Sequence, residues 1–101
     1  MKFLAIQKEP VFSTPESIDA ANKLRPAQWE YFKRLKDQGK IEAHYTFAGY
    51  VGGATIFNVD TIEELDKIVI ESPMYFYHTW DIHPLVPHEK RKSVFQEIMK
   101  R

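Results

Sequence analysis

The amino-acid sequence predicts an α+β fold in which helices cover one face of a four-stranded antiparallel sheet. Segments with the patterns of strands and helices follow in the order strand, helix, strand, strand, helix, strand, with a further short helix at the C-terminus. The chain has 101 residues, of which 44% are apolar. This length and composition suit a single domain over residues 1–101 with one modest core.

The first strand and helix are expected in the N-terminal 40 residues. Residues 3–7 are apolar on both faces, which is typical of a covered, central strand. Thr14 is placed to cap the helix that follows, Pro15 suits its first turn, and Gly39 ends it. Pro26 interrupts the helix and predicts a kink. One broad buried face is expected from the apolar residues Ile18, Ala21, Leu24, Trp29, Phe32 and Leu35.

The middle of the chain predicts a β-hairpin. Residues 41–47 alternate strictly, so two faces are expected: Ile41, Ala43, Tyr45 and Phe47 on one, and Glu42, His44 and Thr46 on the other. Residues 54–59 form the next strand, which is mostly apolar on both faces. The glycine-rich residues 49–53 between them suit a tight turn, so the two strands pair as neighbours.

The C-terminal part predicts a helix, a strand and a second helix. Thr61 and Glu64 have the spacing of a capping box, and Ser72 with Pro73 ends the helix that this box starts. Its buried stripe is expected to be Ile62, Leu65, Ile68 and Val69. Residues 77–83 are expected to form the last strand, residues 84–87 a linker, and the remaining residues an amphipathic helix.

This order of elements is that of the split βαβ, or ferredoxin-like, fold, in which the first and third strands are central. Two helices can cover only one face of a four-stranded sheet, and the rest of the chain offers only one short helix for the other. A second copy of the chain is the economical cover. We therefore expect a homodimer or a larger homo-oligomer.

Composition excludes several classes of function. Lysine plus arginine equal aspartate plus glutamate at fourteen each, whereas nucleic-acid binding needs a basic footprint. The absence of cysteine excludes disulfides, thiolate metal sites and a cysteine nucleophile. No apolar segment approaches the length of a signal peptide or a membrane span. The sequence thus predicts a cytoplasmic protein with no nucleic-acid or membrane partner.

Three histidines at a spacing of five, His78, His83 and His88, resemble a metal site at first sight. On a strand, however, the odd spacing places His78 and His83 on opposite faces, so no metal is expected. Asp81 and His83 share a face. This pair is either a solvent-facing polar edge, which we favour, or a carboxylate that orients a histidine as a base.

Residues 39–85 resemble the muconolactone isomerase family. The matching residues are mainly structural: Ala48 and Gly49 in the turn, Phe57 and Val59 on the third strand, Glu63 and Leu65 on the second helix, and Pro73 and Tyr77 before the last strand. The resemblance implies a dimeric α+β barrel. It also implies a cofactor-free reaction that shifts a proton on a small unsaturated lactone bearing a carboxylate. Such chemistry needs a general base and polar groups that hold the developing enolate.

The chain departs from the family at the positions that carry the chemistry. The family uses a carboxylate on the first helix, and a tyrosine and an asparagine just after the hairpin turn. By position, Gln28, Val51 and Gly53 stand there in this chain. Gln28 can form hydrogen bonds but does not accept a proton as a base.

Our first candidate for a catalytic base is His44, because a neutral imidazole takes up a proton near pH 7. Its strand face either lines a pocket or is ordinary surface. The candidate substrate-binding residues are Gln28, Trp29, Glu42, Tyr50, Tyr77 and Trp80. Two other functions remain open: a non-catalytic small-molecule-binding or oligomeric assembly module, and a cofactor-free oxygenase on the same barrel.

Overall fold

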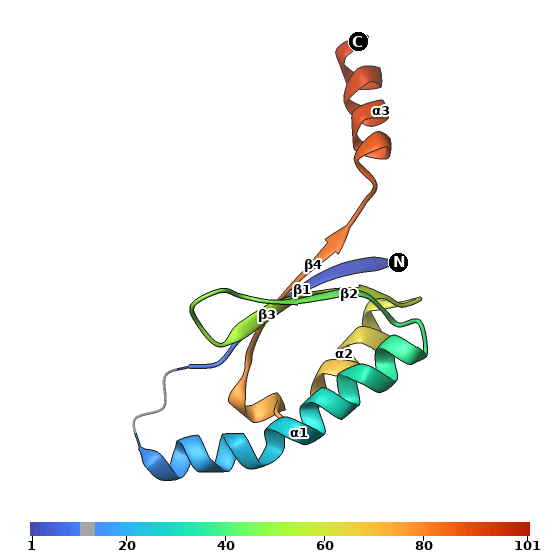
Figure 1. Ribbon diagram of the computed structural model, residues 1–101. Coiled ribbons are helices and arrows are strands. Elements are labelled where there is room, and N and C mark those ends of the chain that lie inside the picture. Colours follow the sequence, from blue (N-terminus) through green and yellow to red (C-terminus); the bar gives the residue numbers. More distant parts are fainter. Residues whose placement is uncertain (11–13) are drawn as a thin grey trace.

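The computed structural model of the protein describes residues 1–10 and 14–101 (Figure 1). Its elements are, in order, β1 (Lys2–Lys8), α1 (Pro15–Asp37), β2 (Ile41–Thr46), β3 (Gly52–Asn58), α2 (Ile62–Ile70), a 3₁₀ helix (Tyr75–Tyr77), β4 (Thr79–Leu85) and α3 (His88–Met99). The strands form one antiparallel sheet in the order β2-β3-β1-β4. The predicted ferredoxin-like α+β fold, with β1 and β3 at its centre, is therefore confirmed.

The ends of α1 lie where the sequence predicts them. The hydroxyl of Thr14 accepts the backbone N–H of Ser17 at 3.1 Å and satisfies a donor that the first turn leaves free. Gly39 ends the helix with a φ of +76°, a conformation that favours glycine. The helix axis turns about midway along its length (Figure 1), and Pro26 lies in this interior stretch.

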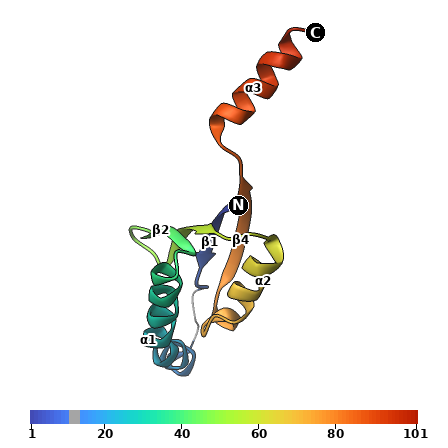
Figure 2. The same ribbon diagram turned by 90° about the vertical axis from the view of Figure 1, so that its right-hand side faces the viewer.

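The core lies between the sheet and the two helices α1 and α2, which cover the same face (Figures 1 and 2). The hydroxyl of Tyr31 on α1 donates to the backbone carbonyl of Ile68 on α2 at 2.7 Å and links the two helices. The buried residues of the main cluster are Phe3, Ala5, Phe32, Leu35, Ile41, Phe57, Val59, Leu65, Ile68 and Val69.

Three residues of the expected helical stripes are exposed, and Leu24 on α1 is only partly buried. Ile18 and Trp29 on α1 are 45% and 66% exposed, and Ile62 at the start of α2 is 45% exposed. On α1 the buried position is taken by the neighbouring Gln28, which is only 5% exposed. Its side-chain oxygen accepts the backbone N–H of Met74, so a buried donor is satisfied where an apolar side chain would leave it unpaired.

The strict alternation predicted for β2 is wrong at its start. Ile41 pairs with Phe57, but Ala43 pairs with Ile56, so Glu42 is an extra residue in the ladder. A β-bulge of this kind reverses the alternation of the strand on one side of it. As a result, Ile41 shares the helix-covered face with His44 instead of lying on the face opposite to it.

The last strand begins and ends two residues later than predicted. Tyr77 belongs to the 3₁₀ helix, and β4 continues to Leu85, so only residues 86–87 of the expected linker lie between β4 and α3. Pro84 lies opposite Phe3 of β1. A proline is tolerated here because β4 is an edge strand, where a missing N–H on the outer side breaks no ladder bond.

Helix α3 stands away from the rest of the molecule (Figures 1 and 2), and none of its residues is buried. The radius of gyration is 16.8 Å, whereas a compact chain of this length has about 13 Å. The molecule is thus extended by its C-terminal arm. Within the described ranges, no helix combines the length and apolar character needed to cross a membrane.

Candidate active site

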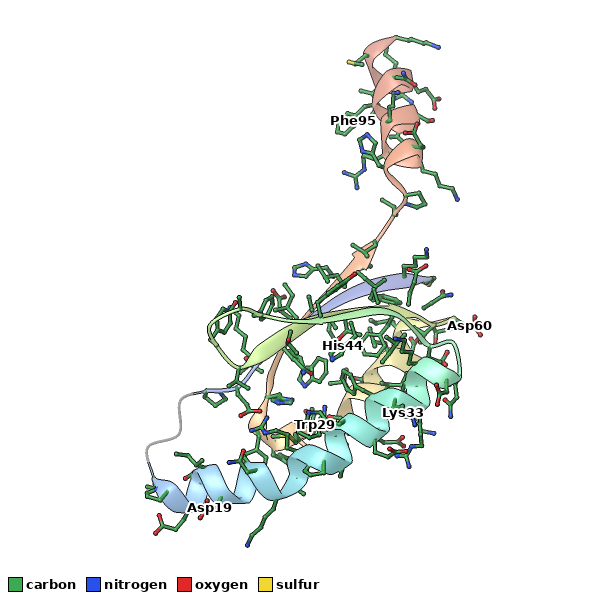
Figure 3. All side chains as sticks on the ribbon, in the orientation of Figure 1. Asp19, Trp29, Lys33, His44, Asp60 and Phe95 are labelled. Atoms are coloured by element: carbon green, nitrogen blue, oxygen red, sulfur yellow. The ribbon has the colours of Figure 1, made fainter. Side chains whose placement is uncertain are left out.

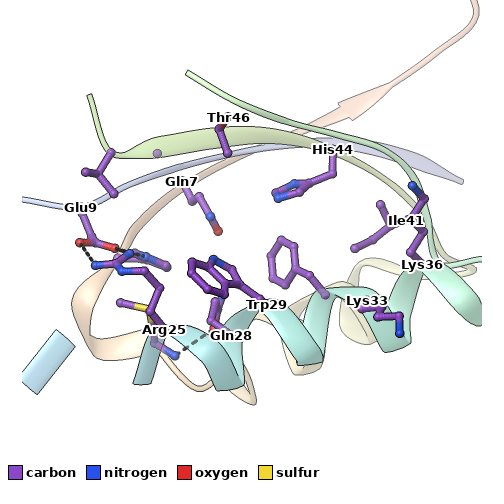
Figure 4. A pocket seen from close by; sticks show the side chains of 15 residues that line it. Gln7, Glu9, Arg25, Gln28, Trp29, Lys33, Lys36, Ile41, His44 and Thr46 are labelled. Carbon is purple, nitrogen blue, oxygen red and sulfur yellow. Dashed lines mark hydrogen bonds and ion pairs between the residues drawn. The ribbon is translucent and has the colours of Figure 1, made fainter. Parts of the chain in front are cut away.

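A pocket with a volume of about 380 Å³ lies between the sheet and α1 (Figures 3 and 4). Strands β1 and β2, helix α1, the hairpin and the segment around the 3₁₀ helix all contribute to its wall. The lining residues are Gln7, Glu9, Arg25, Gln28, Trp29, Phe32, Lys33, Lys36, Ile41, His44, Thr46, Val51, Gly52, Met74 and His78.

His44 projects from β2 towards α1 (Figure 4), and its Nδ1 lies 2.7 Å from Oγ1 of the buried Thr55. Its ring meets Phe32 edge-on, with 4.9 Å between the ring centroids. The residue as a whole is solvent-exposed, but these neighbours enclose part of the ring. This partial burial, together with the charge of Lys36, lowers the pKa of His44 below its usual value. The imidazole is therefore neutral at pH 7.

At one end of the pocket three residues form a nearly buried ionic cluster, which we call the Glu9 cluster (Glu9, Arg25 and His78). Nη1 and Nη2 of Arg25 donate to the two carboxylate oxygens of Glu9 at 2.6 and 2.9 Å. Nε2 of His78 lies 3.2 Å from Oε1 of Glu9. The hydrogen bonds from Arg25 lower the pKa of Glu9, so the carboxylate is ionised and only accepts hydrogen bonds.

The orientation of the Gln28 amide follows from its hydrogen bond with the backbone of Met74. The backbone N–H of Met74 can only donate, and it lies 3.0 Å from Oε1 of Gln28. The amide nitrogen Nε2 is buried and finds no hydrogen-bond partner in the part of the chain that the structure describes. Nδ1 of His78 and Oε1 of Gln7, also buried on the pocket wall, are unpartnered in the same sense.

The three positions that depart from the family's pattern differ in their location relative to the pocket. Gln28 and Val51 line the pocket, whereas Gly53 is part of the β2–β3 ladder. A Cβ atom at Gly53 would lie 2.5 Å from the backbone oxygen of Tyr45. The close strand pairing therefore requires glycine at this position.

Of the predicted substrate-binding residues, Gln28 and Trp29 lie on the pocket wall with His44. Glu42 and Tyr50 lie outside it. The carboxylate of Glu42 pairs with Nζ of Lys2 at 2.8 Å. The ring of Tyr50 stacks on Phe47 in the hairpin, with 5.1 Å between the centroids.

The other two predicted binding residues, Tyr77 and Trp80, are also absent from the pocket wall. Tyr77 ends the 3₁₀ helix. Trp80 packs against the core, with its ring centroid 6.5 Å from that of Phe32 and 6.1 Å from that of His78.

Asp81 and His83 form an exposed ion pair, with Nε2 of His83 3.0 Å from Oδ2 of Asp81. The pair lies outside the pocket, so the solvent-facing alternative fits its position. Over residues 1–10 and 14–101, no three histidine, aspartate or glutamate side chains gather closely enough to hold a metal ion.

Four residues of the pocket wall were not predicted from the sequence, namely Glu9, Arg25, Lys33 and Lys36, and His78 was considered only as a metal ligand. No spacing signal links them, because Glu9 lies 16 residues from Arg25 and 69 from His78 in the sequence. The cations Arg25, Lys33 and Lys36 outnumber the single carboxylate on the wall, Glu9. The pocket thus suits a small anion better than a cation.

Fold and pocket together define a ferredoxin-like α+β protein with a pocket between its sheet and its first helix. Residues 2–91 match the model of the muconolactone delta-isomerase family. The chain belongs to this family, which confirms the resemblance noted in the sequence. It is 30% identical over 70 residues to the muconolactone delta-isomerase of Acinetobacter baylyi, a match that spans 69% of this chain and 73% of that one.

Solved structures with the same fold include two enzymes. A crystal structure of muconolactone isomerase has a TM-score of 0.73 at 23% identity and covers 87% of this chain and 91% of that one. The second is the 5-chloro-2-hydroxyhydroquinone dehydrochlorinase of Burkholderia phenoliruptrix in complex with 2,5-dihydroxybenzoquinone. Its TM-score is 0.67 at 18% identity, over 85% of this chain and 94% of that one.

Proposed function

We propose that the protein catalyses a cofactor-free proton shift on a small unsaturated lactone or a related organic acid. The observation that carries the proposal is His44, whose ring is held by Thr55 in a pocket that bears an excess of positive charge. The lowered pKa of His44 keeps this imidazole neutral at pH 7, as a general base must be. Membership of the isomerase family supports the same reaction class.

In the proposed reaction, Nδ1–H of His44 donates to Oγ1 of Thr55, which leaves the lone pair of Nε2 for the substrate. Nε2 takes a proton from the carbon next to the unsaturated system, and the electron pair moves into the ring as an enolate. Nε2–H then returns the proton to another carbon, so the double bond has moved and His44 is regenerated. The reaction needs no oxidant, reductant or metal.

Two further groups on the wall support this step. Nε2 of Gln28, a buried donor without a partner among the described residues, is available to the developing enolate oxygen. The ammonium groups of Lys33 and Lys36 attract the substrate carboxylate to the end of the pocket near His44. The exposed indole of Trp29 offers a flat apolar surface for the ring.

The direct test is proton NMR of the purified protein with muconolactone in deuterated water. We expect deuterium to enter the ring or the shifted lactone to form, and a His44→Ala variant to lose at least about a hundredfold in rate. His83→Ala is the matched control, because this histidine lies outside the pocket. No exchange above the enzyme-free background at high protein concentration would reject the isomerase proposal.

One observation favours a second candidate, a small-molecule-binding module that has lost the chemistry. The family's helical carboxylate is replaced by Gln28, and its asparagine by Gly53, where the strand pairing leaves no room for a side chain. This candidate predicts saturable binding of muconolactone by calorimetry without any isotope exchange. No comparable observation favours a cofactor-free oxygenase.

We also propose that a second copy of the chain covers the free face of the sheet. This face carries the partly exposed apolar residues Leu4, Ile6, Ala54 and Ile56. Helix α3 exposes Val94, Phe95, Ile98 and Met99 by 50 to 75%. Apolar surfaces of this kind are normally buried, and a homodimer would bury both in a dimeric α+β barrel.

A further inference from the structure

We propose that the inner end of the pocket binds a hydroxyl group next to a carbonyl oxygen: the hydroxyl donates to Nδ1 of His78, and Nε2 of Gln28 donates to the carbonyl. This inference deepens the proposed function and rests on it in one respect, namely that the same pocket binds the substrate. It adds a substrate class, small hydroxy-carbonyl rings such as hydroxyenones, which a plain lactone does not represent.

The hydrogen-bonding role of His78 is set by Glu9. Its Nε2 faces Oε1 of Glu9 at 3.2 Å, and this carboxylate is ionised because Arg25 binds both of its oxygens. An ionised carboxylate only accepts hydrogen bonds, so Nε2 of His78 carries the hydrogen that points to Glu9. In the tautomer with its hydrogen on Nε2, Nδ1 is an acceptor. It is buried on the pocket wall and has no partner among the residues that the structure describes.

The hydrogen-bonding role of the Gln28 amide is set by Met74. Its Oε1 is occupied by the N–H of Met74, so the donor Nε2 is the atom that lacks a partner among the described residues, on a side chain that lines the pocket. Both side chains are more than nine-tenths buried, with exposures of 5% for Gln28 and 4% for the side chain of His78. A buried polar atom without a partner costs about 1–3 kcal/mol, and a ligand that supplies the partner recovers this cost.

The side chains of His78 and Gln28 together specify two neighbouring groups on the ligand. His78 requires a donor and Gln28 requires an acceptor, and a hydroxyl beside a carbonyl supplies both on neighbouring atoms. The pocket volume of about 380 Å³ admits a single small ring. The rings of Trp29 and Phe32 on the same wall provide apolar contact for it.

The test compares two uncharged ligands that differ only in the hydroxyl group. The first is 3-hydroxy-2-methyl-4-pyranone, and the second is 2-methyl-4-pyranone, which keeps the carbonyl and lacks the hydroxyl. Binding of each to the full chain is measured by titration calorimetry at pH 7. We expect the hydroxylated ring to bind about tenfold more tightly, the effect of one buried acceptor being satisfied.

The variant His78→Phe then tests whether His78 is the residue that accepts the hydrogen bond from the hydroxyl. The ring shape is kept, Glu9 stays paired with Arg25, and the expected result is that the two pyranones bind within about twofold of each other. His83→Phe, on the exposed ion pair outside the pocket, is the matched control and should keep the tenfold preference. If His78→Phe lacks the native circular dichroism spectrum, His78→Met takes its place.

Equal affinity of the wild type for the two pyranones, or no saturable binding of either, would overturn the inference. A preference that survives in a folded His78 variant would overturn it as well. These binding measurements need no turnover, so their failure is separate from that of the isomerase. Absence of exchange with muconolactone together with a His78-dependent preference would reject the lactone as substrate and keep the hydroxy-carbonyl site.

Discussion

At the scale of single residues, the chemistry of the pocket depends on side chains whose hydrogen-bond roles are set by one neighbour each. Thr55 holds Nδ1 of His44, Met74 holds Oε1 of Gln28, and Glu9 holds Nε2 of His78. In each case we propose that the opposite polar atom of the side chain binds the ligand. A pocket that lacks the family's helical carboxylate thus still presents donors and acceptors in defined positions.

The protonation of His44 gives a prediction for the pH dependence of the exchange reaction. Partial burial and Lys36 lower its pKa, so the basic, neutral form is populated at a lower pH than for an ordinary histidine. We expect the rate constant kcat/KM to rise with pH and to reach a plateau, with a midpoint below 6.5. A pH series of the NMR exchange assay measures this, and a midpoint above 6.5 would contradict it.

Gln28 gives a second prediction at this scale. In Gln28→Glu, one carboxylate oxygen can still accept the N–H of Met74, but the donor Nε2 is replaced by a second acceptor oxygen. We expect deuterium exchange into muconolactone to fall at least about tenfold, because the developing enolate loses its proposed donor and meets a negative charge instead. Gln38→Glu, at the end of α1 and away from this pocket, is the control. An unchanged or higher rate would show that Nε2 of Gln28 does not stabilise the enolate.

At the scale of elements, the Glu9 cluster joins three segments that are distant in the sequence. Glu9 follows β1, Arg25 lies in the middle of α1, and His78 precedes β4. The ion pair between Glu9 and Arg25 links α1 to the end of β1 at one end of the pocket (Figure 4). The opposite charges of Glu9 and Arg25 offset each other, which lowers the free-energy cost of burying them.

Arg25→Met should show what this contact contributes to folding. Removing the guanidinium leaves a carboxylate whose side chain is only 6% exposed without its main partner. We expect the free energy of unfolding at pH 7 to fall by about 2–4 kcal/mol, somewhat less than for a fully buried pair because Arg25 is one-quarter exposed. Urea denaturation measures it. The double variant Glu9→Gln with Arg25→Met should lose less than Arg25→Met alone.

The same contact has a pH signature. Because the pKa of Glu9 is lowered in the folded state, the unfolded chain binds more protons at acidic pH. The stability difference between the wild type and Arg25→Met should be full above the ordinary carboxyl value of 4.5 and should shrink as the pH falls below it. A difference that is constant from pH 7 to pH 3 would mean that Arg25 stabilises the fold by packing alone.

At the scale of the whole molecule, the dominant feature is apolar surface that one chain does not cover. The sheet is covered on one face only, and α3 extends into solvent beyond β4 (Figures 1 and 3). The large radius of gyration comes from this arm. A partner chain would bury both the free face of the sheet and the apolar side of α3.

Phe95→Glu tests the proposed association. Phe95 is 53% exposed in the single chain, so the monomer should tolerate the change. Figure 3 shows its place on the outlying helix α3. An interface core that must bury a new carboxylate should dissociate. Light scattering after size exclusion should give a dimer or larger for the wild type and a smaller species for Phe95→Glu. Ser93→Glu, at a polar position of the same helix, is the control, and a monomeric wild type at high concentration would reject the proposal.

The sequence by itself determined the order of the elements and many of their ends, because these depend on near neighbours. Thr14, Gly39 and Thr61 act within one helical turn, and the hairpin follows from two apolar strands around glycines. The central positions of β1 and β3 followed from residues that are apolar on both faces. The family could also be recognised, since residues such as Phe57 and Pro73 keep their spacing along the chain.

Only the tertiary structure decided which polar groups share the pocket. The bulge at Glu42 depends on how β2 pairs with β3, and it places Ile41 on the same face as His44. Gln28 is buried because Met74, 46 residues away, needs an acceptor. The Glu9 cluster is likewise a set of long-range contacts between charged groups. Periodicity and capping report local backbone preference, whereas these contacts arise only when distant segments are packed together and buried polar atoms must find partners.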